Sequence, residues 1–434
     1  MNYWINDISL ANKGKTEVQN TLRDMPGISE IRKLFEGQKP FKDVKITGCV
    51  WVTYETANFI MLLKDLGANI RWCSDNKYAS LDDACAYLVS ENVSVFAKKG
   101  MTDDEYYECF EQAWQFPNPD GSISGPDYII DDGCDITRFL HEKHPDVMSK
   151  VRGLTEQTTC GITSLMKLYA DGKLLCPAFN VNDAVTKSKF DNIYGSRESL
   201  IEGIQRVLNV QIAGKKVIIY GYGEVGKGCC QTMKGLGAHV AVCEIDPIMA
   251  MQAHMEGYEV YDRDTASRTG DIFITATGCI KVIDREDILK MKNDAVLANM
   301  GHGNMEINTE YLNSDEYRKE EINPLLHRYV DSTGKGLFLL CNGYLVNATG
   351  GAGHPPRVMS ITFSNHFVAL LSMIRNPEVY SDKRVYKPTR IQEEFVAQLN
   401  FPDLKGKLIR LTEEQANYLS INPNGPYKRE DYRY

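Results

Sequence analysis

The segment 216–244 constrains the fold of this chain more than any other part of its sequence. A β-rich run at 216–220 leads directly into Gly221-Tyr222-Gly223-Glu224-Val225-Gly226, which opens a predicted helix at 225–236. A second predicted strand, 239–243, follows this helix and ends at Glu244. A G-x-G-x-x-G motif between a strand and a helix, with an acidic residue about twenty residues further on, predicts a Rossmann dinucleotide-binding unit. The alternative is a glycine turn in another kind of βαβ unit.

Each feature of this motif has a separate physical role. Gly221 allows the tight turn after the strand, Gly223 lets a pyrophosphate approach the backbone, and Gly226 lets the helix pack closely on the strand. The helix N-terminus offers free N–H groups and a partial positive charge to the phosphates. Glu244 would accept hydrogen bonds from a ribose 2'-hydroxyl and would repel a 2'-phosphate, so the predicted cofactor is NAD rather than NADP.

Strand and helix patterns alternate along most of the chain, which predicts α/β architecture with parallel sheets. The first region has predicted strands at 44–50, 69–73, 93–97 and 128–130, and predicted helices at 54–66 and 161–170. The second begins near residue 197, with a predicted helix at 198–207, further strands at 272–275, 295–298 and 337–340, and a return to helix at 358–374. The last fifty or so residues are rich in charges and tyrosines, which is typical of a disordered tail or of one that docks on another surface.

The composition excludes several classes of protein. The 434 residues carry a net charge of −9, which argues against binding to nucleic acid or to an anionic membrane. Residues 1–15 lack the apolar core of a signal peptide, and the longest apolar runs, such as 59–63 and 367–371, are too short to span a membrane, so a cytoplasmic location is expected. The 12 cysteines include no C-x-x-C pair, which predicts reduced, buried thiols and no metal site. His141 and His144, at i, i+3 on a predicted helix, fit either a metal pair or a solvated helix face.

Several further blocks of the sequence resemble the S-adenosylhomocysteine hydrolase family. The blocks are NVNDAVTKSKFDNIY (180–194), GYGEVGKG (221–228), EIDP (244–247), MEGYEV (255–260), TGCI (277–280) and the terminal DYRY (431–434). The similarity extends over 7–434, essentially the whole chain, and the TKSKFDN and GYGEVGKG blocks are highly specific to that family.

The resemblance implies a bilobed fold. A Rossmann NAD-binding domain, 198–352, would be inserted into a discontinuous α/β substrate domain, 1–183 and 356–387, with hinges at 184–197 and 353–355. The C-terminal tail, 388–434, would mediate oligomerisation. Its Lys428 and Tyr432 would reach the NAD of a neighbouring protomer in a homo-oligomer, expected to be a tetramer.

The resemblance also implies a reaction in which NAD is a catalytic cofactor that is regenerated on each turnover. The 3'-hydroxyl of an adenine nucleoside is oxidised to a ketone, a base removes the acidified C4' hydrogen, and the 5' substituent leaves by elimination. In the hydrolase, water then adds at C5' and the ketone is reduced again. Loss of the 5' group from an enolate is far easier than its direct displacement at an unactivated carbon.

Where this sequence matches the family's motifs, the resemblance implies a role for individual residues. Lys187 and Asp191 match the ribose-binding pair, His302 matches a proton-carrying residue at the ribose, and Asp132 matches the carboxylate near C5'. As a base, Lys187 needs a pKa lowered by burial or by the nearby Lys189. The matches to adenine-binding positions are Thr53, Glu55 and His354, and those to cofactor-binding positions, besides Gly221, Gly223, Gly226 and Glu244, are Glu224, Val225, Thr158, Thr159, Asn192 and Asn347. Without the resemblance, the cluster around Lys187 would be interpreted as a solvated turn, and the two histidines as core or loop residues.

The chain departs from the family at several positions. Trp51 stands where the family has a histidine that works, together with the carboxylate near C5', on the leaving group and the incoming water. An indole cannot transfer that proton, but it fills space and excludes water. Gln157 stands where the family has a glutamate that contacts the ribose hydroxyls. The amide of glutamine can still form a hydrogen bond there, but it lacks the negative charge. The other replacements are Asp75 for a cysteine and Leu81 for a polar residue near the adenine side, Gly303-Asn304 for Phe-Asp, Tyr344 for an arginine, Ser196 for a cysteine, and Met249 for an asparagine.

The positions for NAD and for oxidation are therefore retained, whereas those around the 5' group are changed. This contrast suggests a nucleoside dehydratase or lyase, which loses the 5'-hydroxyl as water and releases a 4',5'-unsaturated nucleoside after the ketone is reduced. Two alternatives remain: authentic hydrolysis of S-adenosylhomocysteine to adenosine and homocysteine, and an NAD-binding pseudoenzyme that regulates a partner.

Overall fold

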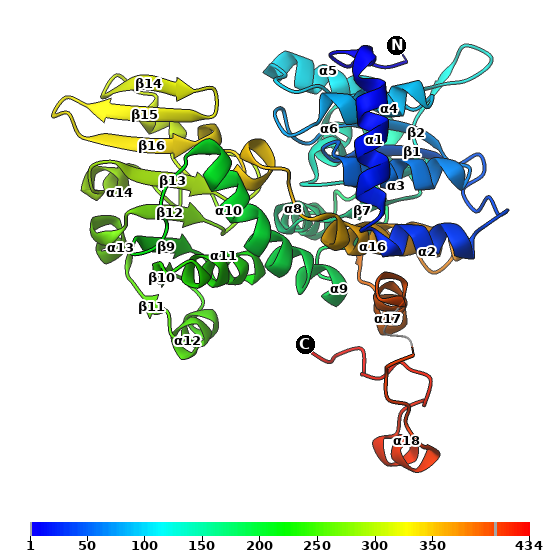
Figure 1. Cartoon of the computed structure of the whole chain (residues 1–434). Coiled ribbons are helices and arrows are strands. Elements are labelled where there is room, and N and C mark those ends of the chain that lie inside the picture. The colour runs from blue at the N-terminus through cyan, green and yellow to red at the C-terminus, as the bar shows by residue number, and fades with distance from the viewer. Residues whose placement is uncertain (1, 403–405) are drawn as a thin grey trace. The chain divides into compact units, whose positions relative to one another are not determined.

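The computed structural model describes residues 2–402 and 406–434, so three residues of the predicted tail lie outside it. The chain divides into two compact units, which Figure 1 shows with their elements labelled. Unit 1 comprises 1–188 and 356–434, and unit 2 comprises 189–355, so unit 2 is inserted between two segments of unit 1. Each unit is built around its own largely parallel sheet, which confirms the predicted α/β class with an inserted Rossmann-like domain.

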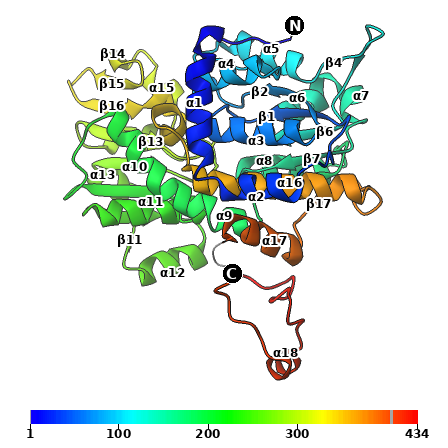
Figure 2. The same ribbon diagram turned by 45° about the vertical axis from the view of Figure 1, so that its right-hand side comes forward.

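Unit 1 contains a seven-stranded sheet of order β17-β8-β7-β6-β1-β2-β3, in which every neighbouring pair is parallel. From β1 the chain moves outward through β2 and β3, then returns to the other side of β1 for β6, β7 and β8. Figure 2 labels β1, β2, β6 and β7 of this sheet. The topological switch point of the sheet therefore lies between β1 and β6. The strands are β1 (Lys45–Cys49), β2 (Asn69–Cys73), β3 (Ser94–Phe96), β6 (Tyr128–Asp131), β7 (Gly153–Glu156), β8 (Ala178–Asn180) and β17 (Val385–Tyr386), and a separate antiparallel pair is formed by β4 (Phe116–Pro117) and β5 (Ile123–Ser124).

The helix α16 (Pro356–Arg375) is a core element of unit 1, where it packs against α2, α3, α17 and β7. It is long and apolar enough to cross a membrane, but 78% of its apolar window is buried inside the structure, which is typical of a core helix. The other helices of unit 1 are η1 (Ile8–Leu10), α1 (Ala11–Leu22), α2 (Pro26–Leu34), α3 (Tyr54–Asp65), α4 (Asp82–Ser90), α5 (Asp103–Ala113), α6 (Asp135–Lys143), α7 (Pro145–Met148), α8 (Thr159–Ala170), α9 (Val185–Ser188), α17 (Arg390–Asn400) and α18 (Glu413–Leu419).

Unit 2 contains an eight-stranded sheet of order β11-β10-β9-β12-β13-β16-β15-β14, in which only the pairs formed by β14 and β15 are antiparallel. Successive residues of its central strands enter different cores, so both faces are covered, as expected for a parallel sheet. The strands are β9 (Lys216–Tyr220), β10 (His239–Cys243), β11 (Glu259–Val260), β12 (Ile272–Thr275), β13 (Ala295–Asn299), β14 (Tyr317–Asn323), β15 (Leu326–Asp331) and β16 (Gly336–Leu340), and the helices are η2 (Asp191–Gly195), α10 (Ser196–Val207), α11 (Glu224–Gly235), α12 (Pro247–Met255), α13 (Arg263–Thr269), α14 (Arg285–Lys290), α15 (Thr309–Leu312), η3 (Cys341–Gly343) and η4 (Val346–Gly350).

The two helical histidines fit neither interpretation that their spacing suggested. On α6, His141 Nδ1 lies 2.7 Å from the carbonyl oxygen of Thr137, and its Nε2 accepts from the N–H of Leu175 at 3.2 Å. His144 Nε2 lies 2.8 Å from Glu111 Oε2. Both rings are half-buried and bind different neighbours, so they form neither a pair of ligands nor a freely solvated face. All 12 cysteines are free and most of them are buried, as predicted.

Candidate active site

Four side chains of unit 1 follow the carboxyl ends of four neighbouring strands. Trp51 comes after β1, Asp75 after β2, Asp132 after β6 and Gln157 after β7. Parallel strands end at the same edge of a sheet, and ligands of open α/β sheets bind in the crevice at the switch point of this edge. Because the switch point lies between β1 and β6, Trp51 and Asp132 flank it. The fold therefore gathers the positions that the resemblance assigned to the 5' end of the substrate.

A chain of hydrogen bonds leads to the carboxylate of Asp132. Gln157 Nε2 donates to Asp132 Oδ2 at 2.6 Å, and Gln157 Oε1 lies 3.0 Å from His366 Nε2. His366 Nδ1 lies 2.7 Å from the hydroxyl of Thr155 in β7. All four residues are buried. His366, on α16, is 209 positions from Gln157, and sequence analysis did not find it.

Two further acids under this edge have structural roles. Asp131 accepts the N–H groups of Asp132 and Thr137, and its complete burial raises its pKa to about 7. Glu156 accepts the N–H groups of Gly133, Cys134 and Thr158 at 2.8–2.9 Å. Burial, followed by the charges of Asp131 and Asp132, raises the pKa of Glu156 well above its usual range. These two carboxyls hold the turn after β6 and the start of α8.

Asp75 lies beside the backbone of Trp51. Its Oδ1 accepts the N–H of Trp51, and the carbonyl of Trp51 accepts the hydroxyl of Thr56 at 2.9 Å. A carboxylate oxygen of Asp75 also lies within 4.8 Å of one of Asp132. The sequence comparison placed Asp75 near the adenine side of the site. The structure also places Asp75 next to Trp51, which matches the 5' end, because β2 lies next to β1. Its place near the adenine side stays a prediction.

The predicted adenine-binding positions of unit 1 open helix α3. Thr53 is its N-cap, with Oγ1 accepting the N–H of Thr56 at 3.2 Å. Glu55, in the first turn, is buried, and this burial raises its pKa. A buried carboxyl that holds a proton more readily can donate a hydrogen bond to a ring nitrogen, which suits an adenine edge.

Lys187 is presented by α9, a short helix that two contacts anchor within unit 1. The hydroxyl of Thr186 donates to Asn365 Oδ1 at 3.0 Å, and the N–H of Val185 donates to Glu393 Oε1 at 2.7 Å. Lys187 itself is 5% exposed. The side chain of Lys189, proposed above as a modifier of Lys187, pairs with Glu224 at 2.6 Å in unit 2. Its charge is therefore balanced by a carboxylate.

The first residues of unit 2 bring Asp191 and His354 together. Asp191 Oδ1 lies 3.3 Å from His354 Nδ1, and both Asp191 and Asn192 are buried in η2. A side chain at Gly195 would meet the His354 ring at 2.4 Å, so glycine is required for this approach. Within unit 2 the ring of His354 thus contacts the predicted ribose-binding acid. The role of His354 at the adenine, which the resemblance implies, stays a prediction.

The glycine motif has the backbone that dinucleotide binding requires. Gly221 has a φ of 95°, and a Cβ at Gly226 would lie 2.0 Å from the carbonyl oxygen of Gly221. Gly223 is the N-cap of α11, which begins with Glu224 and Val225, and a Cβ there would meet nothing within 4 Å. The space over Gly223 is therefore open, which fits an approaching pyrophosphate.

Glu244 lies at the end of β10, next to this turn. Its carboxylate accepts the N–H of Tyr222 at 2.6 Å and those of Ile245 and Asp246 at 2.7 and 3.0 Å. These bonds fix the carboxylate at the edge of the motif, where a ribose 2'-hydroxyl would find an acceptor.

His302 lies in a loop that Asn299 holds in place. Asn299 Nδ2 donates to the carbonyl oxygens of Gly301, Gly303 and Gly343, each at 2.9 Å, and its Oδ1 accepts the N–H of Gly301 at 2.8 Å. His302 is half-buried at the carboxyl end of β13. A fixed loop with an accessible imidazole fits the proton-carrying role that the resemblance assigns.

Asn347 offers an independent test of whether unit 2 fits NAD. Its Nδ2 donates to Ser199 Oγ at 3.1 Å, but its buried Oδ1 has no hydrogen-bond partner among the described residues. A buried acceptor that receives no hydrogen bond lowers the stability of the fold, unless a bound ligand donates one. The carboxamide of a nicotinamide is such a donor, so the residues present fit the cofactor.

The remaining predicted cofactor residues belong to unit 1. Thr158 and Thr159 form the N-terminus of α8, where Thr159 Oγ1 accepts from Asn182. Lys428 and Tyr432 are exposed in the tail, with the ammonium of Lys428 4.7 Å from the centroid of the Tyr432 ring. The carbonyl of Tyr432 accepts from Arg390 at 3.1 Å, which ties the tail to the start of α17.

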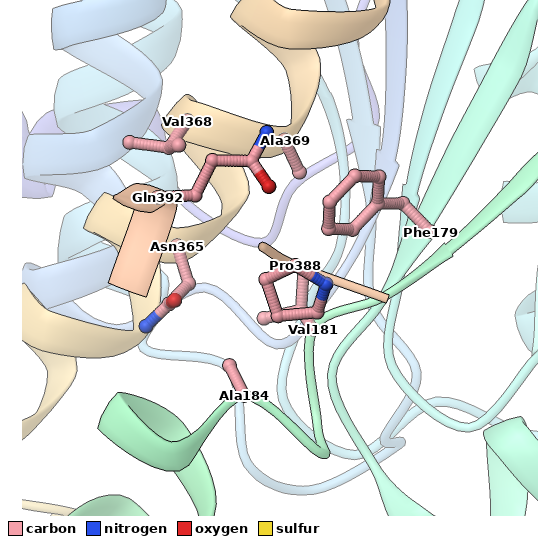
Figure 3. A pocket seen from close by; sticks show the side chains of 8 residues that line it. All are labelled: Phe179, Val181, Ala184, Asn365, Val368, Ala369, Pro388 and Gln392. Atoms are coloured by element: carbon pink, nitrogen blue, oxygen red, sulfur yellow. The ribbon is translucent and has the colours of Figure 1, made fainter. Parts of the chain in front are cut away.

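A small cavity of unit 1 lies between β8, α16 and α17 (Figure 3). The cavity is lined by the apolar side chains of Phe179, Val181 and Val368 and by the amide groups of Asn365 and Gln392. Its volume of about 10 Å³ has room for about one water molecule. The cavity is thus too small for a substrate, and it lies outside the candidate site.

Comparison with known proteins gives two family matches. Residues 2–145 match the family model described as S-adenosyl-L-homocysteine hydrolase, and residues 192–353 match the one described as its NAD binding domain. The chain is also similar to a dipicolinate synthase chain from Bacillus halodurans, with 12% identity over 77% of this chain and 99% of that chain and a TM-score of 0.46. A 3-phosphoglycerate dehydrogenase from Entamoeba histolytica, solved with NAD⁺, has 12% identity over 79% of this chain and 99% of its own, with a TM-score of 0.42. TM-scores this low support no conclusion about function, so the family assignment rests on the two family matches.

Proposed function

Because the chain belongs to the S-adenosyl-L-homocysteine hydrolase family and carries its NAD-binding domain, we propose that it removes water from the 5' end of an adenine nucleoside. The product would be a 4',5'-unsaturated nucleoside. A homotetramer with its tail at a neighbour's cofactor remains a prediction from the resemblance, and a cytoplasmic location remains a prediction from the sequence.

The reaction divides between cofactor and protein. Bound NAD would take the hydride from C3' and return it after elimination, so the net change is the loss of one water. In this proposal Lys187 accepts the proton of the 3'-hydroxyl, and Asp191 orients the ribose. His302 would carry protons at the ribose. Asp132 and its neighbours face the 5' group, where the C5'–O bond breaks.

The replacement at Trp51 is the observation that carries this proposal. The hydrolase needs water to add at C5', and in the family a histidine beside the carboxylate near C5' takes part in that addition. Here an indole flanks the switch point instead, and the carboxylate of Asp132 accepts a hydrogen bond from the amide of Gln157, which stands where the family has a glutamate. A site without that histidine lacks the group that the family uses at C5' to activate the incoming water. Elimination without the second addition is the reaction that these residues support best.

Mass spectrometry tests the proposal directly. We expect the purified protein, incubated with adenosine or a related adenine nucleoside, to form a product lighter by one water. The same protein is assayed for thiol release from S-adenosylhomocysteine. Thiol release without the lighter product would assign the chain as a hydrolase. Bound NAD that no nucleoside reduces would indicate a pseudoenzyme, and absence of the lighter product from every adenine nucleoside would end the dehydratase proposal.

Trp51→His should restore part of the hydrolase reaction. We expect thiol release from S-adenosylhomocysteine to rise at least about tenfold over the unaltered protein, because general acid–base catalysis contributes about 10²–10⁴-fold when well positioned. Trp114→His is the matched control, since Trp114 is another half-buried tryptophan of unit 1, with its ring 4.8 Å from that of His144. Equal thiol release from both variants would show that the indole does not block hydrolysis.

A further inference from the structure

The hydrogen-bond chain at Asp132 has one consistent direction. An amide nitrogen can only donate, so Gln157 Nε2 gives a hydrogen to the carboxylate and Gln157 Oε1 is left to accept from His366 Nε2. The other ring nitrogen of His366 then accepts the hydroxyl hydrogen of Thr155. Every hydrogen in the chain points toward Asp132. Such aligned bonds polarise one another, and in a buried setting they favour negative charge at the end of the chain.

A second carboxylate, that of Asp75, lies close to Asp132. An oxygen of Asp75 lies within 4.8 Å of one of Asp132, and the two residues are only 9% and 8% exposed. Two carboxylates this close in a buried site do not both ionise readily, so the pair tends to keep one proton. If the chain holds Asp132 as the ionised partner, the proton belongs to Asp75.

The atom that carries this proton follows from the backbone of Trp51. Asp75 Oδ1 accepts the Trp51 N–H, and a protonated carboxyl carries its hydrogen on the oxygen that does not act as this acceptor. Oδ2 is therefore the donor atom. Trp51, which stands where the family has a histidine, thus also holds Asp75 at this edge of the sheet through its backbone N–H.

We propose that Asp75 donates the proton that the departing 5'-oxygen requires, with Asp132 as its ionised partner. This inference rests on the proposed dehydration and names the acid for that reaction. As the C5'–O bond breaks, its electron pair stays on oxygen, which takes the proton from Asp75 Oδ2 and leaves as water. The electron pair of the broken C4'–H bond forms the C4'–C5' double bond, and the base holds the C4' proton. Exchange with solvent then returns a proton to Asp75 and removes one from the base, so no oxidant or reductant is consumed.

A change of leaving group separates this role from a structural one. The variant is Asp75→Asn, which keeps an acceptor for the Trp51 N–H. With a 5'-hydroxyl nucleoside we expect its rate of water loss to fall by about 10²–10³-fold. With the corresponding 5'-chloro-5'-deoxynucleoside, chloride leaves without a proton, so its release should stay within about threefold of the unaltered enzyme. Reduction of bound NAD by either nucleoside should also be unchanged, because oxidation at C3' needs no acid at C5'.

The controls make each outcome decisive. Asp135→Asn removes a nearby carboxylate that binds Tyr106 and Arg138, and it should leave both elimination rates unchanged. If Asp75→Asn slows chloride and water loss equally, Asp75 acts on the structure of the site and the proposal is overturned. Normal water loss by Asp75→Asn overturns it as well. If the unaltered enzyme releases no water, the proposed function is overturned, and the role of Asp75 with it. If the unaltered enzyme releases water and only the Asp75→Asn results disagree with expectation, the role of Asp75 is overturned and the proposed dehydration stands.

Discussion

Replacing Lys187 by alanine is expected to lower the rate of nucleoside-dependent NAD reduction by about 10²–10⁴-fold. As hydride leaves C3', the hydroxyl proton must go to a base, and Lys187 is the residue that the TKSKFDN block supplies for this purpose. The side chain is buried, and α9 is held by Thr186 on Asn365 and Val185 on Glu393, so the turn should persist without the ammonium group. Absorbance of the reduced nicotinamide, followed after mixing the NAD-loaded protein with nucleoside, measures this step alone.

Lys189→Ala is the matched control for this experiment. Lys189 lies two positions further on, but its charge is paired with Glu224, and its side chain is 34% exposed. We expect its loss to change the rate of NAD reduction by less than about threefold, as is usual for an exposed ion pair. Thermal unfolding and NAD titration of both variants exclude damage to the fold. NAD reduction at the normal rate in Lys187→Ala would remove this lysine from the oxidation step and contradict the division of roles proposed here.

The fold was largely predictable because its parallel strands are short, fully buried apolar runs between helices. Five strands of unit 2, namely β9, β10, β12, β13 and β16, lie within one residue of their predicted bounds. The hairpin of β14 and β15 was missed. β14 is an edge strand whose sequence, YRKEEIN, is mostly charged and carries no alternating apolar pattern, and it is defined by pairing with β15 rather than by its own composition. β8 and β17 are too short to give a periodic signal.

The candidate site was predictable only where one local motif carries it. The glycine turn and Glu244 are such a case, because the chain between them is a single βαβ unit. The environment of Asp132 is different, because it is built from distant parts of the chain. Gln157 and His366 are in contact although 209 positions separate them, and Asp75 lies nearby because β2 is the neighbour of β1 in the sheet. A family comparison assigns a position to a subsite but does not show what a changed residue binds. For this reason the hydrogen bond between Asp75 and the Trp51 backbone was not predicted, and His366 was not found.

The second large effect is expected at the glycine motif, where two substitutions should separate stability from cofactor binding. Gly226→Ala places a Cβ 2.0 Å from the carbonyl oxygen of Gly221, so α11 must move away from β9. Overpacking of this kind costs about 3 kcal/mol of unfolding free energy, or more, and should abolish NAD binding with it. Gly223→Ala meets no protein atom within 4 Å, and its φ of −68° suits any residue. The apoprotein should therefore lose only about 1 kcal/mol, as for alanine at an N-cap.

Gly223→Ala should nevertheless weaken NAD binding by at least about 100-fold, or ~2.7 kcal/mol, because its methyl group occupies the space that the pyrophosphate needs. Denaturant unfolding of the apoproteins and fluorescence titration with NAD measure the two quantities separately. Gly235→Ala, at the other end of α11 and also without neighbours within 4 Å, should change neither binding nor stability by more than about 1 kcal/mol. Normal NAD affinity in Gly223→Ala would mean that the pyrophosphate does not approach this backbone. The open space above Gly223 would then have to be explained by packing alone, although nothing in unit 2 fills it within 4 Å.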